Sequence, residues 1–357
     1  MEIRNIAKNY SFISCSGKEQ NKGNVNFCAK NGLYKDVVDI SQKNDKKSIL
    51  NKSAIIASGM AIVGTALFAA TKGKLNILKQ IPKSTEFVNA KTVKEAVSYG
   101  KKSLKIQRYE NSDLANLDMI NTLNEMLYNE KKLTGEIPQV IRFLKKGELP
   151  VTAPMGYHLD PKTNKKILAV NPDTFNRFDE VIENAFVERG TGTGLSNFIA
   201  LKDGKYVLSD LSYKSSTMDK FIEKLNAYNP NSSFKDKMEL YQGISCAKSV
   251  ANAKNLGLKD LKMQDFAYDY IFIHEMGHMH HQSIYPKYQE AGGQMTQLRK
   301  DFTYNTEKYQ IPYRVSSYAA TSPLEFVAEV YTYLRKGVHF DNEVMSLYRC
   351  YNGPLVN

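Results

Sequence analysis

Apolar side chains recur every three or four residues in several stretches of the chain, which predicts amphipathic helices. Residues 84–133 show this period among many charged side chains, and residues 216–228 (STMDKFIEKLNAY) show it again. KKILAV at 165–170 is a short apolar run typical of a strand. NFIALKDGKYVLSDL at 197–211 surrounds an Asp-Gly pair at 203–204, which predicts a hairpin with a two-residue turn. The pattern therefore indicates several helices together with a small number of strands.

Two further helices are predicted in the C-terminal part. DFAYDYIFIHEMGHMHHQSIY at 265–285 should form one helix, with Asp265 as its N-cap and its end just before Pro286. The second helix is predicted to begin after the N-cap Ser322, to have proline at its first position, and to run to about Lys336. Both helices carry acidic or histidine side chains among apolar ones, so these polar groups need partners.

The N-terminal part has a different character. Residues 1–50 are rich in Asn, Lys, Ser and Gly, which is typical of a disordered or loosely ordered segment. Residues 53–71 (SAIIASGMAIVGTALFAAT) contain no charge, and as a helix these 19 residues would span roughly 28 Å, near the ~30 Å of a bilayer core. The run is only weakly hydrophobic, so a buried or glycine-rich soluble helix is the alternative. Lysines flank both ends, so the positive-inside rule gives no orientation. We expect a membrane-associated protein with a single span, or else a secreted one.

The net charge of +12 is unevenly distributed. Lys and Arg exceed Asp and Glu by five in residues 1–53 and by seven in residues 72–110, whereas residues 111–357 contain equal numbers of each sign. A nucleic-acid groove would place basic side chains in the folded body, so we expect no nucleic-acid partner.

HEMGH, residues 274–278, has the spacing of a helix that binds a catalytic zinc ion. His274 and His278 are one turn apart, so both imidazoles lie on one face of a helix and can bind a single ion. Glu275 lies about 100° around the helix from His274, where a carboxylate can accept a proton from metal-activated water. We therefore predict one zinc ion per chain, with both histidines as ligands and Glu275 as general base.

Two more histidines follow this motif, His280 and His281, and neither has ligand spacing. His281 is two turns, or about 10 Å, from His274 along the helix axis, which is too far for the same ion. We expect both side chains to have structural roles near the helix end, where partly charged imidazoles suit the helix dipole.

The third zinc ligand has to come from another part of the sequence. Glu325 and Glu329 lie one turn apart on the second predicted helix, so one can bind the ion while the other accepts the outer N–H of a ligand histidine. The alternative is that Glu325 only closes the helix start, because Ser322-Pro-Leu-Glu325 also fits a capping box.

HEMGH and SYAATSPLEFVAE (317–329) resemble motifs in the metalloprotease domain of anthrax lethal factor and its relatives, a gluzincin group. The resemblance implies that Glu325 is the third zinc ligand, that Glu329 supports the metal site, and that Tyr318 assists catalysis. It further implies an α+β, zincin-like catalytic domain with the HExxH helix and a small antiparallel or mixed sheet. Peptide binding along a sheet edge is also implied.

We therefore expect a zinc-dependent endopeptidase that acts on a peptide or protein substrate, with Tyr318 stabilising the oxyanion. One alternative is a catalytically silent, membrane-tethered zinc-fold binding module, against which the intact Glu275 argues. Another is a metallo-hydrolase of a non-peptide substrate. The predicted organisation is an N-terminal tail (1–50), a candidate membrane-inserted helix (53–71), a charged helical region (84–135) and a zinc metalloprotease domain (136–357).

Overall fold

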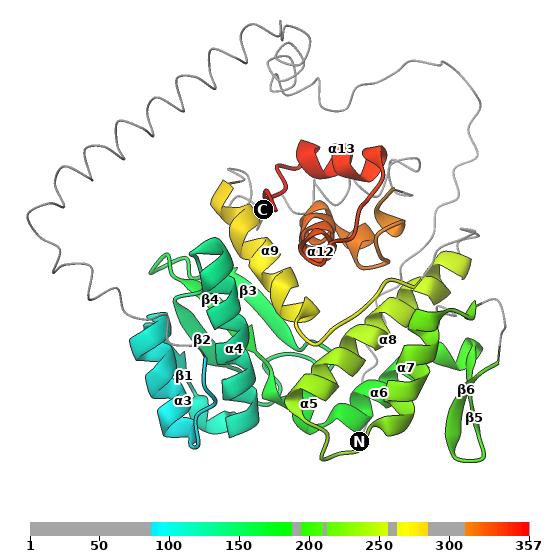
Figure 1. The fold of residues 1–357 in the computed structure, drawn as a ribbon, viewed down its shortest axis with the longest axis horizontal. Coiled ribbons are helices and arrows are strands. Elements are labelled where there is room, and N and C mark those ends of the chain that lie inside the picture. The colour runs from blue at the N-terminus through cyan, green and yellow to red at the C-terminus, as the bar shows by residue number, and fades with distance from the viewer. Residues whose placement is uncertain (1–86, 188–193, 210–212, 256–262, 285–310, 357) are drawn as a thin grey trace, which may run out of the picture. The chain divides into compact units, whose positions relative to one another are not determined.

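The computed structural model describes residues 87–187, 194–209, 213–255, 263–284 and 311–356 (Figure 1). Ser84–Asn357 forms one compact unit. The predicted tail at 1–50 and the apolar run at 53–71 lie outside the described residues, so both stay predictions. Within the described ranges, no helix combines the length and apolar character needed to cross a bilayer.

A four-stranded mixed sheet forms one layer of this unit. Its strands, in spatial order, are β1 (Arg108–Glu110), β2 (Val140–Phe143), β4 (Lys166–Val170) and β3 (Met155–Leu159). β1, β2 and β4 run parallel, whereas β3 pairs antiparallel with β4 and places Tyr157 opposite Leu168. The two central strands, β2 and β4, are almost wholly buried, as expected for short runs of branched apolar residues covered on both faces. β3 is left as an edge strand.

The described part of the unit also contains many helices. The first group consists of α3 (Val93–Tyr99), the π-helical turn η3 (Gly100–Leu104), the 3-10 turn η4 (Ser112–Leu114), α4 (Leu117–Thr134), α5 (Pro172–Asn176) and α6 (Phe178–Phe186). The second group consists of the 3-10 turn η5 (Leu195–Asn197), α7 (Ser216–Ala227), α8 (Phe234–Asn255), α9 (Tyr270–Ile284), the 3-10 turn η7 (Ala319–Thr321), α12 (Pro323–Arg335) and α13 (Asn342–Cys350). Figure 1 shows α9 running beside β3, with α12 and α13 beyond it. The described part is therefore a mixed α+β fold with a small sheet and many helices.

Several local predictions are confirmed. The predicted strand at 165–170 is β4, and the predicted helix at 216–228 is α7. The predicted hairpin consists of β5 (Ile199–Lys202) and β6 (Lys205–Leu208). Its turn residues, Asp203 and Gly204, have φ values of 50° and 75°, the left-handed conformations that a tight two-residue hairpin turn requires.

The region at 84–135 is less purely helical than its periodicity predicts. It contains α3 and α4, but it also contributes β1, which pairs in parallel with β2. The sheet thus crosses the boundary placed near residue 136, and both sides of that boundary belong to the same compact unit. The periodicity does not reveal β1 because a three-residue strand is too short to show an alternation.

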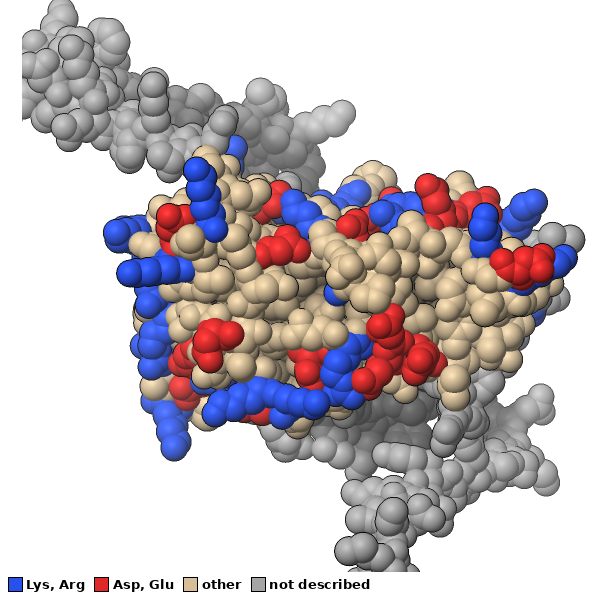
Figure 2. Space-filling model, turned by 90° about the horizontal axis from the view of Figure 1, so that it is seen from below, with Lys and Arg blue, Asp and Glu red and all other residues tan. Residues whose placement is uncertain are grey.

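Charged side chains of both signs lie on the surface of the unit. Figure 2 shows one face on which Lys and Arg are interspersed with Asp and Glu and with uncharged side chains. Several of these charges are paired, as in the contacts of Arg142 with Glu110 at 2.6 Å and of Lys224 with Glu239 at 2.6 Å. Surface pairs of this kind, here partly buried, contribute little to stability, typically about 0–1 kcal/mol each.

Candidate metal centre

α9 begins later than predicted. The residue in the N-cap position is Asp269, whose backbone carbonyl accepts the first helical hydrogen bond from the N–H of Ile273 at 2.9 Å. The predicted cap, Asp265, instead accepts a hydrogen bond from the N–H of its neighbour Phe266 at 2.9 Å. Phe266 is fully buried and packs edge-on against Phe221, and residues 263–267 form neither helix nor strand. The cap prediction was therefore wrong, because burial of this aromatic ring outweighs local helix preference.

α12 begins where the sequence predicts. Ser322 has extended backbone angles, its hydroxyl accepts a hydrogen bond from the N–H of Glu325 at 3.2 Å, and Pro323 occupies the first helical position. The cap uses the backbone of Glu325 and leaves its carboxylate available. Helix capping and metal binding at Glu325 are therefore compatible rather than exclusive.

Gly277 brings α9 and α12 together. A Cβ atom at this position would lie 3.1 Å from Cα of Ala328 and 3.1 Å from Cδ1 of Tyr331, closer than ordinary van der Waals contact. The absence of a side chain thus permits the two helices to cross at short range. This close crossing brings the start of α12 next to the face of α9 that carries the histidines.

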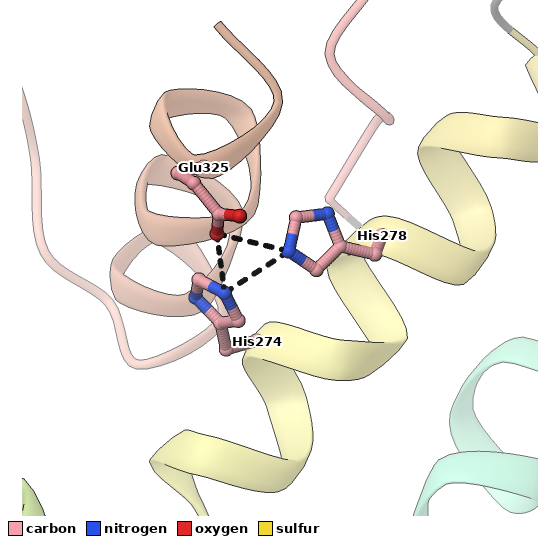
Figure 3. A group of neighbouring side chains, drawn as sticks. All are labelled: His274, His278 and Glu325. Atoms are coloured by element: carbon pink, nitrogen blue, oxygen red, sulfur yellow. Dashed lines mark hydrogen bonds and ion pairs between the residues drawn. The ribbon is translucent and has the colours of Figure 1, made fainter. Parts of the chain in front are cut away.

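Three side chains converge from these two helices (Figure 3). Nε2 of His274, Nε2 of His278 and Oε2 of Glu325 lie 3.1 Å from one another in all three pairs. Ligand atoms bound tetrahedrally to zinc at about 2.0–2.1 Å are about 3.3 Å apart, so the observed triangle fits one zinc ion closely. Two imidazoles and one carboxylate are also a donor set typical of catalytic zinc. These three residues can therefore hold a metal ion.

A second layer of hydrogen bonds orients His274. Its Nδ1 donates to Oε1 of Glu329 at 2.8 Å, and the other carboxylate oxygen of Glu329 accepts from the hydroxyl of Ser316 at 2.7 Å. The Ser316 hydroxyl oxygen in turn accepts from the N–H of Ala319 at 2.8 Å. A carboxylate in this position fixes the histidine tautomer and makes the other ring nitrogen a better ligand. Glu329 thus lies where the sequence predicts a supporting acid.

The electrostatics of the centre favour a positive charge. Burial lowers the pKa of His274, but hydrogen bonds to Glu325 and Glu329 and the charges of both carboxylates outweigh it and raise that pKa well above its usual range. Burial raises the pKa of Glu325, but the charge of His278 and the hydrogen bonds from both histidines lower it by more. The pKa of Glu325 therefore lies below its usual range. The buried carboxylate of Glu329 and the partly buried carboxylate of Glu325 on either side of one imidazole therefore need a cation, which either a proton or a metal ion can supply.

Glu275 and Tyr318 lie beside the three candidate ligands. Glu275 is buried, and its Oε2 accepts a hydrogen bond from the backbone N–H of Tyr157 in β3 at 2.6 Å. The ring of Tyr318 lies 5.5 Å from the ring of His274. Burial of Tyr318 and, after it, the charges of Glu325, Glu275 and Glu329 raise its pKa, so its hydroxyl stays a proton donor at neutral pH. Because Tyr318 is 47% exposed, the charges of the nearby carboxylates account for the raised pKa better than burial does.

His280 and His281 point away from the metal ligands, as predicted. Nε2 of His280 contacts the buried Glu130 of α4 at 2.9 Å. His281 is fully buried and its Nε2 donates to the backbone carbonyl of Tyr351 at 2.7 Å. The predicted partial charge is wrong for His281, because burial lowers its pKa to about 4. It is right in direction for His280, where hydrogen bonds to Glu130 and Glu136 outweigh burial and raise the pKa.

Two contacts of the centre have no signal that the sequence alone would reveal. Ser316 lies directly before the SYAATSPLEFVAE motif, but a serine hydroxyl in a loop has no spacing rule that links it to Glu329. The N–H of Tyr157 is a backbone group, and every non-proline residue has one. Comparison with known proteins adds no further assignment, since no protein-family model, no curated protein and no solved structure matches the chain.

Proposed function

We propose that this chain is a zinc-dependent endopeptidase of the lethal factor-like gluzincin type, with one zinc ion held by His274, His278 and Glu325. The observation that carries the proposal is the triangle of donor atoms 3.1 Å apart with Glu275 on the same helix as the two histidines. A module that only binds zinc has no need of a base at this position. The intact, buried Glu275 therefore favours an enzyme.

A zinc ion held at this position supplies a Lewis acid that lowers the pKa of water to about 7. Glu275 accepts a proton as water attacks the peptide carbonyl, and returns it to the leaving nitrogen as the C–N bond breaks. The hydroxyl of Tyr318 donates a hydrogen bond to the carbonyl oxygen as that oxygen gains negative charge. Glu329 keeps His274 in one orientation and tautomer throughout.

A peptide substrate is favoured by the position of β3. This edge strand packs against α9, which carries the two histidines and the base. An extended chain that lies along a sheet edge forms main-chain hydrogen bonds with it, irrespective of side-chain identity. A substrate lying there would bring its peptide bonds close to Glu275. Among the residues that the structure describes, no comparable feature favours a non-peptide substrate.

The test is hydrolysis of a peptide library by the purified full chain, with zinc content measured on the same preparation. We expect about one zinc per chain, cleavage that a chelator abolishes, and recovery when zinc is returned. Glu275→Gln should keep zinc and lose activity, because an amide cannot accept the proton. His278→Ala should lose zinc, whereas His339→Ala, a matched change at an exposed histidine, should change neither property.

Four results would contradict the proposal. Retention of zinc by His278→Ala would remove the assigned site, and two ions per chain would show that it is incomplete. Zinc binding without cleavage of any library peptide would leave a silent binding module. Full activity in Glu275→Gln would exclude the assigned base.

A further inference from the structure

The backbone of β3 alternates between two directions. The carbonyl of Pro154 accepts from the N–H of Asn171 at 2.8 Å, and the N–H of Asp160 donates to the carbonyl of Lys165 at 2.9 Å. Pro154 and Asp160, at the two ends of β3, therefore direct their backbone groups toward β4. Because the direction alternates along a strand, Met155, Tyr157 and Leu159 direct theirs away from β4, toward the free edge. The N–H of Tyr157 is thus an outward group of an edge strand.

This outward N–H has one specific partner. It donates to Oε2 of Glu275 at 2.6 Å, across 118 positions of sequence. Glu275 is 7% exposed, and within the described part of the chain no other hydrogen bond reaches its carboxylate. A hydrogen bond to an ionised acceptor is about twice as strong as one between neutral groups. This contact is therefore a strong local constraint on the side chain of Glu275.

The donor is itself held firmly in place. The segment before β3 is anchored by Asn171, which is fully buried and donates its side-chain amide to the carbonyls of Pro150 and Ala153 at 3.0 Å each. The hydroxyl of Tyr241 on α8 donates to the carbonyl of Thr152 at 2.6 Å. Asn171 and Tyr241 come from different parts of the fold, and both hold the segment 150–154 in place. The Tyr157 amide is therefore preorganised rather than a mobile edge group.

We propose that the backbone amide of Tyr157 is the positioning group for the general base. It fixes Oε2 of Glu275 and leaves Oε1 to exchange the proton. An unrestrained glutamate samples several rotamers. A displacement of a catalytic group by about 1 Å lowers the rate on the order of 10²-fold. The inference rests on the proposed function, since it assigns a role to Glu275 as base. A second consequence is that this N–H is committed and does not pair with a substrate backbone.

Proline substitution tests the amide directly. Tyr157→Pro removes the N–H, and an edge position tolerates proline because the ladder to β4 does not use that group. Tyr157→Ala is the matched control, because it removes the ring but retains the N–H. Leu159→Pro is the second control, because it places proline at the next outward position of the same strand. The full chain is used throughout, with zinc content measured for each variant.

We expect Tyr157→Pro to lower kcat on the order of 10²-fold with KM and zinc content unchanged. Tyr157→Ala should keep a kcat close to wild type, because it retains the N–H. Leu159→Pro should raise KM and leave kcat close to wild type, because it removes an outward N–H of the edge proposed to bind the substrate backbone. Equal values of kcat in Tyr157→Pro and Tyr157→Ala would overturn the inference. A rise in KM at constant kcat in Tyr157→Pro would also overturn it, since the amide would then serve substrate docking.

A measurement independent of activity completes the test and remains valid if the proline variant does not fold. Hydrogen exchange at the Tyr157 amide should be slow in wild type and faster in Glu275→Ala, whereas Glu275→Gln should keep most of the protection because its amide oxygen still accepts. Equally fast exchange in wild type and Glu275→Ala would refute the contact. Absence of chelator-sensitive hydrolysis in wild type would instead reject the proposed function, and the exchange result would still decide whether the contact exists.

Discussion

Glu329→Gln isolates the contribution of charge in the layer behind His274. The Glu329 carboxylate accepts from Nδ1 of His274 at 2.8 Å and from the hydroxyl of Ser316 at 2.7 Å. A glutamine can keep both contacts, because its oxygen accepts from the imidazole and its amide donates to the serine oxygen. Only the negative charge is lost. Glu329→Ala loses both contacts and leaves Nδ1 without its acceptor.

Outer-layer losses of this kind typically weaken metal binding by about 10 to 100-fold, or about 1.4–2.7 kcal/mol. We expect Glu329→Gln near the lower limit and Glu329→Ala near the upper one, because the second change adds lost hydrogen bonds to the lost charge. Ser316→Ala should have a smaller effect than either, since it removes only the outermost contact. Each variant should still bind one zinc at saturating metal.

The assay is a competition titration of zinc against a chelator of known affinity at pH 7.5. Thermal unfolding of the metal-free proteins serves as the check on folding. Glu343→Gln is the charge-matched control, because it removes one acid from an exposed position on α13 that lies outside the site. Wild-type zinc affinity in Glu329→Gln and Glu329→Ala would refute the supporting role. Complete loss of zinc in Glu329→Gln would show instead that Glu329 is a ligand.

Further changes test the ligand, the oxyanion donor and a buried histidine. Glu325→Gln should weaken zinc binding strongly while the helix stays capped, and zinc affinity equal to wild type would remove it as third ligand. Tyr318→Phe should keep zinc and lower kcat on the order of 10²-fold, whereas unchanged turnover would exclude its hydroxyl as oxyanion donor. The pKa of His281 is about 4 in the folded chain and about 6.5 when unfolded, so the unfolded state binds more protons between these values. The free energy of unfolding should therefore fall as pH drops from about 6.5 to about 4, by about 3 kcal/mol at most. In chelator-treated protein, His281→Gln should lose this part of the pH dependence. Identical pH profiles of unfolding for the wild type and the variant would contradict the prediction.

Local features of the sequence determine much of the centre. The four-residue spacing of His274 and His278 places both rings on one side of any helix that contains them. Ser322 with proline after it determines where α12 starts, and hence that Glu325 and Glu329 lie one turn apart. These predictions depend only on helix geometry and capping chemistry, which act between residues close in the chain. They hold irrespective of how the helices pack.

The position of the start of α9 depends on packing. The sequence predicts Asp265 as the N-cap, four residues before Asp269, which occupies that position in the structure. Burial of Phe266 against Phe221 keeps the segment after Asp265 out of the helix, so Asp269 takes the position. Propensity is a weak local preference of well under 1 kcal/mol per residue, whereas a buried aromatic ring contributes about 1.5–3 kcal/mol.

The assembly of the site itself was decided only by the tertiary structure. Glu325 reaches the histidines across 47 to 51 positions of sequence because α9 and α12 cross closely at Gly277. Tyr157 reaches Glu275 across 118 positions because β3 is an antiparallel edge strand whose outward N–H faces α9. Side-chain patterns specify which face of an element is apolar, but they do not specify which elements meet or at what distance. A backbone amide is the same chemical group at every non-proline residue, so only its place in the fold makes this one specific to the base.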